Sequence, residues 1–354
     1  MNDLDAPGTY TDHDSGGMGD LIEGLPAQVA DAWEASASMG LQAAETPSQV
    51  LVLGMGGSAI GGDMLAAVVA AQSPVPVRVI RGYDVPPGLG PETLVVASSN
   101  SGSTEETLTA LDAVLEMGAK VVAITRGGTL GAIAEDRGLP IYRHDFVSPP
   151  RAAIGHSLMP LLRIAERVGL VQDADASVVE AVAVMSELRE RIRIEVPEPE
   201  NHAKQLARRL SGKLPVIFGA EHLVPAARRW RTQFAENAKT WAIVDELPEA
   251  DHNTIVGFHR PGWLPERMHA VFLRDPSLHP RVRIRYGLTQ QALTDLHVPY
   301  DVVESSGSGP LSDILSAVLF GDYVSYYLAM ADGVDPTPIE PIDRLKARLA
   351  EIEG

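Results

Sequence analysis

The sequence contains no cysteine, and aromatic residues make up only 5% of its 354 residues. Without cysteine the chain can form no disulfide, no zinc ribbon and no thiol nucleophile, which fits a reducing cytoplasm. No apolar run reaches the roughly 18 to 20 residues that cross a bilayer, so we expect no membrane partner. The first residues are acidic and lack a basic start followed by an apolar core, so we expect no signal peptide.

Basic residues are scarce relative to acidic ones. Lysine and arginine number 29 against 47 aspartates and glutamates, a formal net charge of −18. Such a surface repels phosphate backbones, so we expect no nucleic-acid partner. The ten histidines show no H-x-H or H-E-x-x-H spacing, so we expect no metal. An anionic small ligand would therefore be held locally, by backbone N–H groups and a few placed cations.

The length and the pattern of the chain predict two α/β domains. Short β-branched runs alternate with helical segments, which is typical of parallel, doubly wound sheets with helices on both faces, as in flavodoxin-like folds. The predicted strands lie at residues 50–54, 75–82, 93–99, 120–127 and 140–145, and again at 214–220, 268–275 and 298–305. We expect a flexible acidic tail at 1–20, a first domain at 21–170, a helical connection at 171–210, a second domain at 211–335 and a C-terminal helix at 336–354 near the active site.

A glycine-rich turn follows the first predicted strand, in "LVLGMGGSAIGGDML" (residues 51–65). Gly54, Gly56 and Ala59 satisfy the G-x-G-x-x-G/A spacing of dinucleotide-binding turns. The physical content of this pattern is broader, because glycines let a backbone approach a ligand and the next helix presents free N–H groups. The turn alone therefore does not distinguish a dinucleotide from a phosphorylated substrate.

A second, hydroxyl-rich turn decides between these ligands. "SSNSGSTEET" (residues 98–107) follows the third predicted strand, which in a doubly wound sheet commonly lies beside the first, with ligands bound beyond their carboxyl ends. Ordinary helix capping by Thr104 is the simpler explanation of one such turn. Two such turns at one crevice favour a phosphate monoester, whose oxygens accept several hydrogen bonds each. The predicted substrate-binding residues are Gly56, Gly57, Ser58, Ser99, Ser101 and Thr104.

These motifs resemble a known family. "SNSGSTEET" is similar to the signature of sugar isomerase (SIS) domains, and "GMGGSAIGGD", "ENAK" and "HNTIVG" resemble the bifunctional phosphoglucose/phosphomannose isomerases. The resemblance implies two SIS domains and a metal-independent aldose–ketose isomerase without a cofactor. It would interconvert glucose 6-phosphate, and with it mannose 6-phosphate, with fructose 6-phosphate through an enediolate. It also implies a homodimer.

Isomerisation through an enediolate needs a base and a cation near the developing oxyanion. Glu236, in "RRWRTQFAENAK", lies off the apolar stripe of its predicted helix, and the resemblance assigns it as the base. Arg151, in "VSPPRAAIGHSL", follows two prolines that stiffen its backbone, and the resemblance assigns it to the enediolate. A solvated surface glutamate and a structural salt bridge are the alternatives.

Two further residues are assigned to opening of the sugar ring by the resemblance. His252, in "LPEADHNTIVGF", would reach the active site from the partner subunit. Histidine suits ring opening because the neutral and charged forms of an imidazole are both accessible near pH 7. Lys346, in "PIDRLKARL", lies on a predicted C-terminal helix. The alternatives are a loop histidine satisfied by a neighbour and a lysine in surface charge pairs.

Two other functions remain open at this point. An NADP-dependent oxidoreductase could use Arg81, at the end of the second predicted strand, to hold a 2′-phosphate. A non-catalytic phosphosugar-binding SIS protein would need the two turns but not Glu236, His252 and Arg151. The choice between C2 epimers would depend on the surroundings of one carbon, for example a hydroxyl such as that of Thr337. Arg126, in "ITRGG", departs from the small polar residue expected in the family and bears on substrate preference.

Overall fold

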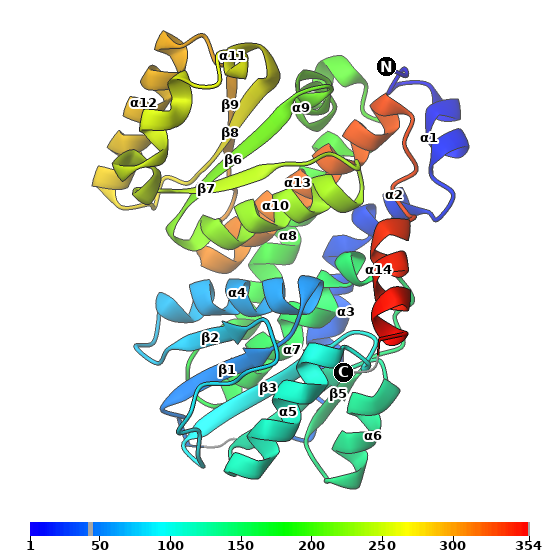
Figure 1. Ribbon diagram of the computed structural model, residues 1–354, viewed down its shortest axis with the longest axis vertical. Coiled ribbons are helices and arrows are strands. Elements are labelled where there is room, and N and C mark those ends of the chain that lie inside the picture. Colours follow the sequence, from blue (N-terminus) through cyan, green and yellow to red (C-terminus); the bar gives the residue numbers. More distant parts are fainter. Residues whose placement is uncertain (42–44, 353–354) are drawn as a thin grey trace.

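A computed structural model describes residues 1–41 and 45–352, arranged as two α/β lobes stacked along the long axis (Figure 1). The first lobe is built on a five-stranded parallel sheet in the order β2-β1-β3-β4-β5. The first and third strands are neighbours, as the sequence predicted, with Leu53 paired to Ala97. The strands are β1 (Gln49–Leu53), β2 (Val77–Ile80), β3 (Thr93–Ser99), β4 (Lys120–Thr125) and β5 (Ile141–Arg143).

The second lobe repeats this topology with one strand fewer. Its parallel sheet has the order β7-β6-β8-β9, which corresponds to β2-β1-β3-β4 of the first lobe. The predicted class of two doubly wound sheets is therefore confirmed. The sequence analysis missed the edge strand β7, because only its last residue is buried and it carries two acidic residues. The strands are β6 (Leu214–Ala220), β7 (Ile243–Leu247), β8 (Met268–Arg274) and β9 (Tyr300–Glu304).

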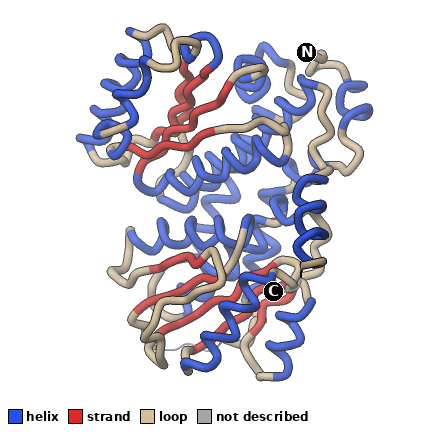
Figure 2. Tube along the Cα trace, in the orientation of Figure 1, coloured by secondary structure: helices blue, strands red, loops and turns tan. Residues whose placement is uncertain are grey.

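Helices lie between the two sheets and also cover their outer faces (Figure 2). In the first lobe they are α3 (Leu25–Ser36), α4 (Gly56–Ala70), α5 (Glu105–Met117), α6 (Gly128–Asp136) and α7 (Ile154–Arg167). The connection holds α8 (Ala174–Ile192) and α9 (His202–Leu210), and the second lobe holds α10 (Val224–Glu236), α11 (Leu264–Arg267), α12 (Pro280–Asp295) and α13 (Pro310–Asp332). Helices α4, α10 and α13 contact one another, so one continuous apolar core runs through both lobes.

Helix α13 is the central helix of this core. It is long and apolar enough to cross a bilayer by length and composition, although the sequence analysis expected no such segment. Its most apolar stretch is 94% buried inside the protein. It packs against α8, α9 and α10, so its apolar composition is accounted for by packing within the chain.

The first twenty residues do not form the flexible tail that their acidic composition suggested. They contain α1 (Pro7–His13) and the start of α2 (Met18–Glu23). Leu4 is fully buried, and the Tyr10 hydroxyl donates to the Leu4 carbonyl at 2.6 Å while its ring stacks on Tyr326. A few apolar side chains among many acids were enough to anchor this segment, because burial of each contributes about 1.5–3 kcal/mol.

The C-terminal helix α14 (Glu340–Ala350) runs along the side of the molecule (Figure 1) and has no buried residue. The segment just before it lies inside the protein, where the carbonyl groups of Pro336 and Thr337 accept hydrogen bonds. The predicted helix is therefore present, and its connection, not the helix itself, makes the buried contacts. Residues 353 and 354 of the predicted helical segment lie outside the described residues.

Anchoring of the N-terminal segment predicts that Leu4→Ala destabilises the protein. Removing this buried side chain should lower the free energy of unfolding by about 2–5 kcal/mol, because a cavity is left in the core. The measurement is the urea midpoint followed by circular dichroism. Leu288→Ala is the matched control, since Leu288 is 64% exposed, and equal midpoints for the two variants would contradict the anchoring.

Candidate active site

The first turn joins β1 to α4. A Cβ on Gly54 would lie 3.1 Å from the Ser98 carbonyl oxygen, so glycine lets the end of β1 approach the end of β3. Gly56 has a φ of +51°, in the left-handed region that favours glycine. Within the described residues no side chain caps the N-terminus of α4. The Ser58 N–H donates to the Met55 carbonyl at 3.1 Å. The N–H groups of Gly56 and Gly57, which have no such acceptor among the described residues, and the Ser58 hydroxyl are available to an anion.

The second turn joins β3 to α5. The Ser99 and Thr104 hydroxyl oxygens lie 2.8 Å apart, and the Ser99 hydroxyl accepts from the Gly102 N–H at 3.1 Å. The Ser101 hydroxyl accepts from the Ser103 N–H at 3.2 Å. Thr104 occupies the N-cap position of α5, but its side chain makes no capping hydrogen bond. Simple helix capping by Thr104 therefore does not account for the hydroxyls of this turn.

Arg151 lies in a short 3₁₀ turn, Pro150–Ala152, and joins the two lobes. Its side chain is only 3% exposed. The Nε donates to Asn237 Oδ1 at 2.7 Å, and Nη1 lies 3.4 Å from Glu236 Oε2. The Nη2 donates to the carbonyls of Pro336 at 2.7 Å and Thr337 at 3.1 Å. Burial lowers the pKa of Arg151, and Glu236 opposes that shift.

The glycine-rich turn packs directly on the loop that carries Arg151. A Cβ on Gly57 would lie 2.9 Å from the Pro150 carbonyl oxygen, and Ser157 Oγ donates to the Gly57 carbonyl at 3.2 Å. The structure therefore brings together the first turn, Arg151 and Glu236, three features that are far apart in the sequence.

Buried polar side chains behind Arg151 were not found from the sequence. Arg229 donates to the Arg151 carbonyl at 2.9 Å and forms an ion pair with Asp322 at 2.6 Å. Gln233 Nε2 donates to Asp322 Oδ1 at 2.9 Å. Burial raises the pKa of Asp322, opposed chiefly by Arg229. An aspartate amid the twenty buried residues of α13 was the available signal, because buried carboxylates are almost always paired.

A lysine outside the predicted set lies beside Glu236. Lys239 Nζ donates to the Glu236 carbonyl at 2.6 Å and to the Pro336 carbonyl at 3.0 Å. Burial and the charge of Arg151 lower the pKa of Lys239. Lys346, the lysine assigned by resemblance, is exposed on α14 and makes no hydrogen bond or ion pair among the described residues.

His252 is exposed at the end of a 3₁₀ turn, Glu249–His252, that follows β7. The neighbouring Asp251 anchors this loop to α12, since it accepts from Arg285 at 3.1 Å and from the Thr289 hydroxyl at 2.8 Å. In the part of the chain that the structure describes, His252 makes no hydrogen bond with Arg151 or Glu236. One chain alone therefore does not assemble the complete predicted set.

Histidines that the sequence analysis did not single out lie beneath the first turn. The His144 and His156 rings stack with centroids 4.4 Å apart. They line a cavity of about 10 Å³, shared with Gly57, Ser58 and Asn100, which is room for about one water molecule. Asn100 Oδ1 and His144 Nδ1 have no partner among the described residues. Burial, with His156 and Arg126 nearby, lowers the pKa of His144 to about 4, so the ring is neutral near pH 7.

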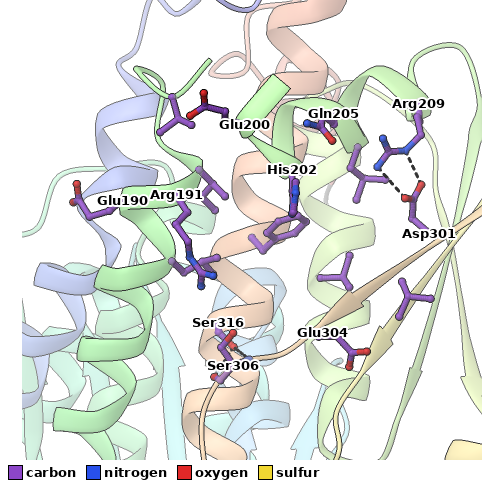
Figure 3. A pocket seen from close by; sticks show the side chains of 17 residues that line it. Glu190, Arg191, Glu200, His202, Gln205, Arg209, Asp301, Glu304, Ser306 and Ser316 are labelled. Atoms are coloured by element: carbon purple, nitrogen blue, oxygen red, sulfur yellow. Dashed lines mark hydrogen bonds and ion pairs between the residues drawn. The ribbon is translucent and has the colours of Figure 1, made fainter. Parts of the chain in front are cut away.

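A much larger pocket lies elsewhere. It has a volume of about 790 Å³ and is lined by residues of α8, α9, β9 and α13 (Figure 3). Its wall mixes acidic and basic side chains, including the ion pair between Arg209 and Asp301 at 2.8 Å. No residue of either turn lines it, and neither does Arg151. Chemistry, not size, therefore identifies the candidate site at the junction of the two turns and Arg151.

The fold and the two turns are those of a protein built from two SIS-type domains. Residues 199–349 match the family model described as the bacterial phosphoglucose isomerase C-terminal SIS domain. The fold is also that of a glucose-6-phosphate isomerase-like protein from Thermus thermophilus, with a TM-score of 0.64 and 22% identity over 96% of this chain and 99% of that one.

Sequence matches that cover most of the chain show which family it belongs to. The chain is 39% identical to a bifunctional phosphoglucose/phosphomannose isomerase from Caldicellulosiruptor bescii, over 95% of this chain and all of the relative. It therefore belongs to the bifunctional phosphoglucose/phosphomannose isomerase family. It is also 32% identical to a D-glucosamine-6-phosphate 4-epimerase from Sulfolobus acidocaldarius, over 63% of this chain and 68% of that protein.

The tight packing of Gly57 predicts that Gly57→Ala weakens phosphosugar binding. The new methyl group would push the first turn away from Pro150 and shift the N–H groups of α4, raising the Kd for fructose 6-phosphate about ten-fold, equivalent to about 1.4 kcal/mol. Isothermal titration calorimetry measures the change. Gly90→Ala is the control, because a Cβ there has no neighbour within 4 Å; unchanged affinity in Gly57→Ala would contradict a ligand at this turn.

Proposed function

We propose that the protein interconverts glucose 6-phosphate and mannose 6-phosphate with fructose 6-phosphate. The observation that carries this proposal is the pairing of the Arg151 guanidinium with the Glu236 carboxylate at 3.4 Å, beside the glycine-rich turn. A phosphate held by the two turns would leave the other end of the sugar near this pair. The sequence similarity to bifunctional isomerases along 95% of the chain supports the choice of substrates.

The chemistry follows from the two charged groups. Glu236 takes the proton from C2 of the open-chain aldose, and the electrons move into an enediolate whose negative charge faces Arg151. The proton of the C2 hydroxyl passes to O1, and the same carboxylate returns its own proton to C1 to give the ketose. Because glucose and mannose 6-phosphate differ only at C2, both give the same enediolate. The Glu236 side chain is 27% exposed, which leaves it accessible to a bound sugar.

Arg151 is suited to its part because it is preorganised. Its hydrogen bonds to Asn237 and to the carbonyls of Pro336 and Thr337 fix the guanidinium plane before substrate arrives. Fixed dipoles and charges stabilise a developing oxyanion without reorganisation at the moment of reaction. The Thr337 carbonyl is one of these acceptors. The residue that we consider for the choice between C2 epimers therefore contacts Arg151 through its backbone.

We assign ring opening to His252 of the partner subunit, and to Lys346 by resemblance. His252 is exposed in a loop that one chain leaves away from Arg151. Apolar side chains in the neighbouring segments are also exposed, with Trp241 and Val256 each at 77% and Trp263 at 50%. Exposed apolar residues of this size favour an interface, so a homodimer would bury them and bring His252 to the second chain.

The oxidoreductase alternative is less well supported. Arg81, the candidate for a 2′-phosphate, forms an ion pair with Asp63 at 2.6 Å, so its charge is already balanced. A non-catalytic phosphosugar-binding protein would have no use for a glutamate placed beside a buried arginine. Absence of any effect of NADP on thermal stability would agree with the isomerase.

Glu236→Gln should abolish isomerisation of both epimers while fructose 6-phosphate still binds. Loss of a positioned base lowers the rate by about 10²–10⁴-fold. Coupled assays with both aldoses, with glucosamine 6-phosphate as a comparison substrate, give the rates, and proton exchange at C2 in deuterated water follows the base directly. Glu34→Gln, at an exposed position of α3, should retain full activity. Normal turnover in Glu236→Gln would remove this residue from the mechanism.

Mixing two inactive variants tests whether the site is shared between subunits. Glu236→Gln and His252→Ala each lack one group, but in a two-fold symmetric heterodimer one of the two sites has neither change. Refolding an equimolar mixture should restore about a quarter of wild-type activity, since half of the dimers are mixed and each has one intact site. Sedimentation velocity verifies the dimer. Activity no higher than that of the separate variants would place His252 outside the partner's site.

A further inference from the structure

The second sheet carries an unassigned cluster at the position that corresponds to the phosphate turns. Because β6 and β8 are topologically equivalent to β1 and β3, their carboxyl ends match the two turns of the first lobe. Hydroxyl groups line the ends of β1 and β3, whereas His222 follows β6 and Asp275 follows β8. Asp313, in the first turn of α13, completes the group.

The three side chains converge on one point. A ligand atom from each of His222, Asp275 and Asp313 lies within 4.8 Å of the other two. His222 Nε2 is 3.4 Å from Asp313 Oδ2, and two ligands bound to one tetrahedral zinc ion at 2.0–2.2 Å are about 3.3–3.5 Å apart. The side chains of His222 and Asp313 are 12% and 3% exposed. This spacing and burial match a metal site more closely than a surface acidic cluster.

The protein satisfies only part of this cluster. Asp275 accepts from the Ser277 N–H at 2.6 Å and from the Ser305 hydroxyl. Asp313 Oδ1 and His222 Nε2 are buried without a hydrogen-bond partner among the described residues. Two buried carboxylates thus face one imidazole, an arrangement that is costly without a further cation.

We propose that His222, Asp275 and Asp313 bind one divalent ion of the zinc class. One imidazole nitrogen and two carboxylate oxygens are all ligands that zinc binds, and three protein ligands leave a fourth position for water. None of the three residues forms a hydrogen bond or ion pair with Arg151 or Glu236 among the described residues, so we give the ion no part in the reaction. The isomerase reaction proposed above does not require it.

The surroundings hold the cluster in place. Glu180 on α8 accepts from the Ser308 and Ser312 hydroxyls at 2.8 and 3.1 Å, which ties the loop before α13 to the connection. Asp275 also lines a surface pocket of about 410 Å³ beside Arg274 and Arg283, so it marks the side of the cluster that faces solvent.

Sequence spacing did not indicate this site. His222, Asp275 and Asp313 are separated by some forty to fifty residues, so they form none of the short ligand motifs that a sequence reveals. They are close in space because strands β6 and β8 are neighbours in the second sheet and helix α13 packs at their carboxyl ends. The expectation of no metal was based on those motifs, and this proposal departs from it.

Zinc titration of the chelator-treated full-length protein tests the proposal. We expect one Zn²⁺ per chain by competition with a chromophoric chelator, and a rise in the thermal midpoint with zinc concentration, because the ion binds the folded state. Co²⁺ in place of Zn²⁺ should give the intense visible absorption of a four-coordinate site. His222→Gln, at a partly exposed position that tolerates substitution, should weaken binding by at least about a hundred-fold, and Asp313→Asn likewise.

His269→Gln is the matched control. His269 Nε2 lies 2.7 Å from Asp301 Oδ2, a histidine–aspartate pair whose members already have partners, so zinc affinity should not change. Wild-type protein that binds no zinc would overturn the proposal. Binding that survives His222→Gln would overturn it too, as would equal losses in His222→Gln and His269→Gln. If Asp313→Asn does not fold, the wild-type stoichiometry, the cobalt spectrum and His222→Gln still decide the outcome.

Discussion

The Arg151 guanidinium is the point at which the two lobes, the chain terminus and the candidate active site meet. It comes from the first lobe and donates to Asn237 at the end of α10 and to two carbonyls that precede α14. Its own carbonyl is held by Arg229, which the buried Asp322 neutralises. A buried cation with several acceptors keeps its geometry only if all of them stay in place. The relative position of the lobes and the readiness of the site therefore depend on the same contacts.

The two lobes share one topology but carry different side chains at the corresponding strand ends. Both sheets use the same strand order, and both place polar side chains at the carboxyl ends of the two central strands, where doubly wound folds bind ligands. The first lobe offers hydroxyls and free helix N–H groups, suited to an anion. The second offers carboxylates and an imidazole, suited to a cation. The same topology thus suits an anion in one lobe and a cation in the other, because the side chains, and not the strand order, set the local electrostatic potential.

Much of the fold could be predicted from the sequence, since the periodicity of buried strands and helices is local. The neighbouring positions of β1 and β3 and the meeting of the two turns followed from the general topology of doubly wound sheets. The edge strand β7 was not predicted because it is half-buried and acidic. The ordered structure of residues 1–20 was not predicted because only a few of their side chains are apolar and most of the others are polar or acidic. The partners of Arg151 come from three distant segments, so only the folded chain reveals them. The same is true of the cluster of His222, Asp275 and Asp313.

The packing of the N-terminal segment also bears on how the protein is made. The Asn2 backbone N–H donates to the Ala331 carbonyl at 2.7 Å, Ser15 bonds to Asp335, and Gly16 lies against Thr337. Ser15 and Asp335 are 320 residues apart in the sequence. Contacts this distant in sequence form late in folding. Because Pro336 and Thr337 also hold Arg151, the candidate active site takes its final shape only when these two distant segments have met.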